Sequence, residues 1–94
     1  MNEKVFELGE RRRVTLEVWL SNGQTFTPAN STWDLSAASY PSSEASGSCD
    51  VREVSDKWQL TAEVEPKRRS TYKLQFTFGM GTEIVKRSVQ IRVV

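Results

Sequence analysis

Apolar and polar side chains alternate along most of this chain, which is the pattern expected of half-buried β-strands. The clearest run covers residues 14–20, where Val14, Leu16, Val18 and Leu20 share one face. The alternation returns over 58–64, 72–78 and 85–93, the last with a break in phase near Lys86 that predicts a β-bulge. Weaker strand patterns cover 4–8, 31–37 and 48–54. No stretch places apolar residues at helical spacing for three turns, so the pattern predicts an all-β protein.

Turn-forming residues separate these seven expected strands at fairly regular intervals. They are Ser21–Gln24, Pro28–Asn30, the serine-rich stretch Ser39–Gly47, Ser55-Asp56, Pro66–Ser70 and Gly79–Gly81. Seven short strands bounded in this way are typical of an antiparallel β-sandwich or small barrel. Ninety-four residues are enough for one core, so we expect a single domain over 1–94.

The spacing of the apolar residues resembles that of immunoglobulin-like domains. In that class the second strand carries the pattern L-x-C and the third carries a buried tryptophan. The fifth strand carries L-x-h, where h is an apolar residue, and the sixth carries Y-x-C. The matching positions here are Leu16-x-Val18, Trp33, Leu60-x-Ala62 and Tyr72-x-Leu74. The resemblance covers about 14–93 and implies a seven-stranded Greek-key sandwich of the bacterial Ig-like or fibronectin kind. Because Val18 and Leu74 replace the cysteines, it does not imply an antigen-receptor role.

The aromatic residues of this pattern are expected to be structural. Alternation turns Trp33, Trp58, Tyr72 and Phe76 inward, where large rings fill a core. The one cysteine, Cys49, is in phase with Val51 and is expected to be a small, inert, buried residue.

Composition removes several classes of function. Thirteen basic and twelve acidic side chains give a net charge of +1, so no whole-molecule field selects nucleic acid or membrane. The absence of histidine removes the commonest general base and metal ligand. No glycine-rich phosphate loop or calcium-loop pattern is present. We therefore expect no enzyme activity, no cofactor and no metal site.

Two basic clusters follow the first and fifth expected strands, at Arg11-Arg12-Arg13 and Lys67-Arg68-Arg69. Sandwich connectivity predicts that these two loops meet at one end of the molecule, where six positive charges could attract an anionic partner. The alternative is that the clusters only protect neighbouring strands from aggregation, and adjacent Glu10 and Glu65 favour it. No series of aromatic residues interleaves with the arginines, which argues against specific nucleic-acid binding.

Three apolar residues are candidate partner contacts. Phe26 and Met80 fall in expected loops at the opposite end, and Trp19 alternates outward while Val18 and Leu20 point inward. An outward tryptophan is either covered by the first strand or left as a contact anchor.

These observations favour a non-catalytic structural or assembly module whose partners are other protein subunits, including further copies of itself. The chain starts at Met1 and shows no apolar signal segment, so we expect cytoplasmic synthesis and no membrane association. Short chains of this style resemble minor virion proteins of phages or prophages. Two alternatives stay open: an extracellular ligand- or carbohydrate-binding domain excised from a longer chain, and an anion-binding module using the basic clusters.

Overall fold

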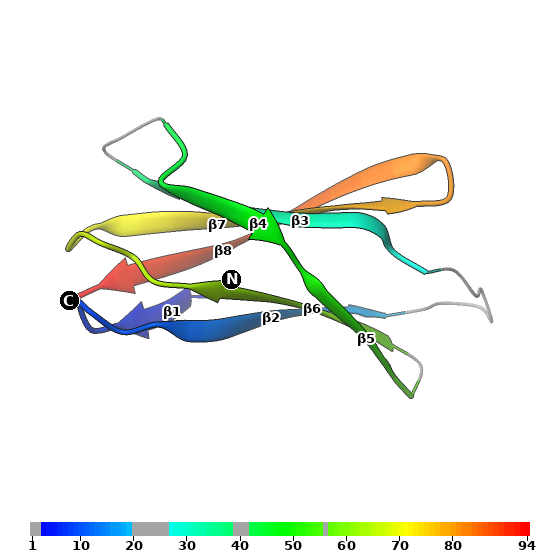
Figure 1. Cartoon of the computed structure of the whole chain (residues 1–94), viewed down its shortest axis with the longest axis horizontal. Coiled ribbons are helices and arrows are strands. Elements are labelled where there is room, and N and C mark those ends of the chain that lie inside the picture. The colour runs from blue at the N-terminus through cyan, green and yellow to red at the C-terminus, as the bar shows by residue number, and fades with distance from the viewer. Residues whose placement is uncertain (1–2, 20–26, 39–41, 56) are drawn as a thin grey trace.

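The computed structural model describes residues 3–19, 27–38, 42–55 and 57–94, and its regular elements are all β-strands. They form two sheets, one in the order β1-β8-β7-β3-β4 and the other in the order β2-β6-β5. The sheets face each other as two layers (Figure 1). The prediction of an all-β sandwich is therefore confirmed, but the prediction that it is antiparallel throughout is wrong, because β1 pairs parallel to β8. The strands are β1 (Glu3–Phe6), β2 (Arg12–Trp19), β3 (Ala29–Ala37), β4 (Ala45–Ser48), β5 (Asp50–Val54), β6 (Lys57–Val64), β7 (Thr71–Met80) and β8 (Glu83–Val93).

The described residues form eight strands rather than the seven expected, because the segment 48–54 is not one strand. The chain changes sheets at Cys49: β4 pairs with β3 in the larger sheet, and β5 pairs with β6 in the smaller one. The backbone N–H of Cys49 donates a hydrogen bond to the carbonyl of Ser31, with 2.9 Å between the nitrogen and the oxygen. This bond holds the chain against β3 where it crosses between the sheets. Much of β4 comes from the serine-rich stretch that the sequence assigned to a loop, because its small polar residues carry no alternation.

The core lies between the two sheets and consists of the inward side chains that alternation predicted. Leu35, Leu60, Leu74 and Phe76 are completely buried, and Tyr72 is nearly so. The two inward tryptophans, Trp33 and Trp58, are only half-buried. The remaining buried apolar residues are Phe6, Val14, Ala37, Ala62, Val64, Phe78, Val89, Ile91 and Val93.

The β7–β8 hairpin keeps one register from Thr71 opposite Arg92 to Met80 opposite Glu83. The bulge predicted near Lys86 is therefore wrong. The loss of apolar phase arises because Arg87 lies on the inner face, directly opposite the buried Phe76. A register shift occurs instead in β3, between Ala29 and Thr32.

The turn of this hairpin has two residues, and its first residue, Gly81, adopts φ of +64°. A positive φ at this position is what a tight hairpin turn needs, and glycine adopts it without a steric cost. The tip of the hairpin bends away from β2 and β6 (Figure 1).

A buried tyrosine ties the two connections at the other end of the sandwich. The Tyr72 hydroxyl accepts a hydrogen bond from the backbone N–H of Arg68 at 3.1 Å and donates to Glu44 Oε1 at 2.7 Å. Glu44 also accepts from the backbone N–H of Lys67 at 3.1 Å. One carboxylate thus holds the β3–β4 connection against the β6–β7 connection.

Candidate interaction surfaces

One long side of the sandwich is open between β2 and β8. Among the described strands, β2 pairs only with β6, and β1 covers β8 only from Gln90 to Val93. The opening is a groove of about 520 Å³, which we call the β2–β8 groove. Its lining is Leu16, Glu17, Val18, Trp19, Phe78, Met80, Glu83, Val85 and Arg87. Because Leu16 and Val18 face this opening, they stay half-exposed although they point inward.

Trp19, the last residue of β2, is 61% exposed at the rim of this groove. The first strand does not cover it, although Lys4 of β1 lines a smaller adjoining cavity of about 290 Å³ with it. The ammonium of Lys57 lies 4.6 Å from the centroid of a Trp19 ring, a favourable cation–π geometry. Trp19 is thus an exposed aromatic ring held against a cation.

Glu17 positions that cation. Lys57 Nζ lies 2.8 Å from Glu17 Oε2, and Gln59 Nε2 donates to the same oxygen at 3.1 Å. These hydrogen bonds, chiefly the one from Lys57, lower the pKa of Glu17. Because the lowered pKa keeps the carboxylate ionised at more acidic pH, the ion pair that holds Lys57 beside Trp19 persists to lower pH than an ordinary glutamate would allow.

Met80, the second expected contact, is the last residue of β7, half-buried and packed against the core. It lines the β2–β8 groove with Trp19. The third, Phe26, lies outside the described residues.

The two basic clusters lie at the same end of the sandwich, because Arg12 pairs with Val64 at the start of β2 and the end of β6. Most of their charge is balanced locally. The ion pairs are Arg12–Glu10 at 3.6 Å, Arg13–Glu63 at 3.9 Å, Lys67–Glu65 at 3.2 Å and Arg68–Glu44 at 3.7 Å. Arg12 also stacks 4.5 Å over the Phe6 ring and donates to the carbonyl of Val5. Arg11 and Arg69 are exposed and form no ion pair with a described residue.

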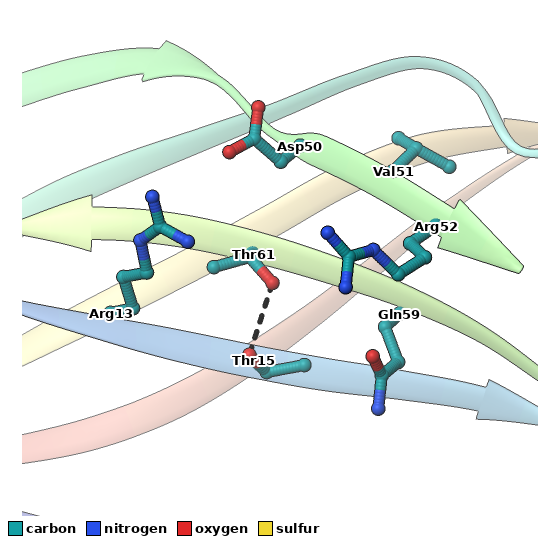
Figure 2. A pocket seen from close by; sticks show the side chains of 7 residues that line it. All are labelled: Arg13, Thr15, Asp50, Val51, Arg52, Gln59 and Thr61. Carbon is teal, nitrogen blue, oxygen red and sulfur yellow. Dashed lines mark hydrogen bonds between the residues drawn. The ribbon is translucent and has the colours of Figure 1, made fainter. Parts of the chain in front are cut away.

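The outer face of the smaller sheet has a polar depression of about 430 Å³ that the sequence did not indicate. Figure 2 shows the guanidinium groups of Arg13 and Arg52 on either side of a hydrogen bond between Thr15 and Thr61. The two threonine oxygens are 3.0 Å apart. The lining is completed by Asp50, Val51 and Gln59. It offers hydrogen-bond donors to a polar ligand, but it has no aromatic ring on which a sugar could stack.

Cys49 is half-buried where the chain crosses between sheets. Burial, with a smaller effect from Asp50, raises the pKa of its thiol to about 11. The thiolate is the reactive form, so the structure supports the expected inert role.

We predict that iodoacetamide alkylates Cys49 at pH 8 about tenfold or more slowly in the folded protein than in the urea-unfolded chain, because the raised pKa removes most of the thiolate. Mass spectrometry of quenched time points measures both rates. Equal rates in the two states would contradict the prediction.

Across the described ranges, no three His, Cys, Asp or Glu side chains converge where they could hold a metal ion. Within the same ranges, no helix is long and apolar enough to span a membrane. No protein-family model, curated protein or solved structure matches this chain.

Proposed function

We propose that this chain is a non-catalytic structural or assembly module that acts through protein–protein contacts on an immunoglobulin-like sandwich. Two features support the immunoglobulin-like assignment. The smaller sheet joins the second expected strand to the fifth, and the larger joins the third, sixth and seventh, as in constant-type domains. The first strand departs from that arrangement, because it lies in the larger sheet and runs parallel to the last strand. The hydrogen bond from Arg68 N–H to the Tyr72 hydroxyl resembles the tyrosine corner of that class.

The observation that carries the assembly role is the open β2–β8 groove with Trp19 at its rim. Apolar side chains of the core reach the surface there, next to strand edges that have no partner among the described residues. Exposed apolar grooves rimmed by polar residues are typical of protein contact sites, and tryptophan is enriched among the residues that dominate such contacts. Its place in a phage or prophage virion stays a prediction.

The ligand-binding alternatives have less support from the described residues. Local carboxylates balance four of the six cations that would form an anion site, and the polar depression lacks the stacking surface that sugar recognition commonly uses. Contact with a protein partner at the β2–β8 groove requires neither an anion site nor a surface on which a sugar stacks.

A site-specific photocrosslinker tests this function in the organism that produces the protein. We expect a crosslinker in place of Trp19 to capture another protein or a second copy, because the contact would bury this position. The same crosslinker in place of Lys73, which is exposed on β7, is the control and should give no adduct. Adducts at neither position, or equally at both, would contradict a contact at the groove.

A further inference from the structure

The edge of β8 is only partly covered. On one side β8 pairs with β7 from Glu83 to Arg92, and on the other it pairs with β1 only from Gln90 to Val93. Its backbone from Glu83 to Val89 therefore has one edge without a partner among the described strands. Such an edge can pair with another chain unless the protein covers or blocks it.

Two charges on this segment lie on the inner face of the sheet. Glu83 is opposite Met80 and Arg87 is opposite Phe76, and both line the β2–β8 groove. Neither side chain forms an ion pair with a described residue, and the guanidinium of Arg87 donates a hydrogen bond to the backbone carbonyl of Lys86 at 2.9 Å. They cannot pair readily with each other, because four residues of strand separate them by about 13 Å.

The segment 83–87 is complementary to itself when two copies run antiparallel. If the two-fold axis passes beside Val85, Glu83 of each copy lies directly opposite Arg87 of the other, on the same face. The outward Ile84, which is 76% exposed, then lies opposite the aliphatic stem of Lys86. Directly opposite side chains in an antiparallel pair have Cβ atoms about 5 Å apart, so the inner charges can form two ion pairs.

The neighbouring registers lack this match. With the axis beside Lys86, two lysines would lie opposite each other, and Arg87 would oppose Val85. With the axis beside Ile84, Glu83 would oppose Val85, and Arg87 would oppose Gly81. Charge complementarity therefore selects the register centred on Val85. Glu83, Ile84, Lys86 and Arg87 are all exposed, and the tip of the hairpin bends away from β2 (Figure 1).

We propose that the 83–87 edge of β8 pairs antiparallel with the same edge of a second copy, with Glu83 of each copy opposite Arg87 of the other. The larger sheets of the two copies then join across a two-fold axis. This inference rests on the proposed assembly function and names its partner. It gives the two inner-face charges oppositely charged partners, which the described residues of the single chain do not supply.

Charge reversal tests this register. We expect the wild-type protein to show a monomer–dimer equilibrium in sedimentation experiments up to about 1 mM, as suits a short strand interface. Glu83→Arg and Arg87→Glu should each weaken dimerisation about tenfold or more, because each places two like-charged pairs across the axis. An equimolar mixture of the two variants should form a heterodimer, because arginines on one copy then face glutamates on the other.

Lys73→Glu is the matched control. It changes the net charge as Arg87→Glu does, but at an exposed position of β7 opposite Gln90, outside the proposed interface, and should leave dimerisation nearly unchanged. Circular dichroism checks that each variant is folded, and the mixture provides a gain of association that misfolding cannot mimic.

Three results would overturn the proposal: a wild-type protein that stays monomeric, a dimer that survives both single reversals, or variants that do not associate when mixed. The second result would leave the assembly function intact and move the contact to another surface. A monomeric wild-type protein whose crosslinker at position 19 captures a different protein would refute self-pairing but would leave the assembly function intact.

Discussion

Replacing Phe76 with alanine is expected to destabilise the fold by about 3–5 kcal/mol, because a large buried ring is lost from the core. The Phe76 side chain is completely buried at the centre of the larger sheet, between Trp33 of β3 and Arg87 of β8 in the strand register. Its loss removes apolar contacts and leaves a cavity that neighbouring strands cannot easily fill. A domain of this length has only about 5–14 kcal/mol of total stability, so a large share is lost.

Urea denaturation followed by tryptophan fluorescence measures this loss. The control is Ile84→Ala at a protein concentration that excludes self-association. Ile84 is apolar but 76% exposed, so its truncation should change the free energy of unfolding by about 0.5 kcal/mol or less. Similar losses for the two variants would refute the placement of the core.

Removing the hydroxyl of Tyr72 is expected to cost about 1–3 kcal/mol of stability, because the groups left behind lose their hydrogen-bond partner. Tyr72→Phe keeps the buried ring but removes the hydrogen bonds to Glu44 and from Arg68 N–H. Hydrogen bonds to a charged group contribute more than neutral ones. A double-mutant cycle with Glu44→Gln separates the side-chain contact from the rest, since the two losses should not be additive.

The same hydroxyl predicts a dependence on pH. Burial of the phenol, and then its hydrogen bond to Glu44, raise the pKa of Tyr72 above its ordinary value of 10.0. Because the folded pKa is above the unfolded one, this contribution is fully present below pH 10 and is lost as pH rises through the folded pKa. The stability difference between wild type and Tyr72→Phe should therefore shrink at high pH. A difference that stays constant would show that the phenol does not titrate in this way.

Alternation along the chain predicted the long strands correctly, because each buries one face over several residues and strand side chains alternate with a period of two. It failed at β4, whose small polar residues pair with β3 at a sheet edge without entering the core. It also failed at Arg87, because an inward arginine broke the apolar pattern and was interpreted as a bulge. Continuing the period of two from Val85 to Val89 would have placed Arg87 inward.

The candidate surfaces were predictable only in part. Trp19 could be identified from the sequence because alternation places this large apolar side chain on the outer face of its strand. The structure leaves the side chain exposed. The groove beside it was not predictable, because it depends on β1 covering only the end of β8 and on β2 having no second partner in the described part of the chain. The neutralisation of the basic clusters was visible in Glu10 and Glu65, but the contribution of Glu44 required the folded β3–β4 connection.

The sequence by itself determined the all-β class, the long strands and most of the core, because these follow from local periodicity. Only the tertiary structure decided which strands pair, where the chain changes sheets and which edges stay open. Those features depend on contacts between distant segments, such as Glu44 with Tyr72, whose energies do not appear in any local pattern. The groove and the self-complementary edge of β8 belong to this second kind.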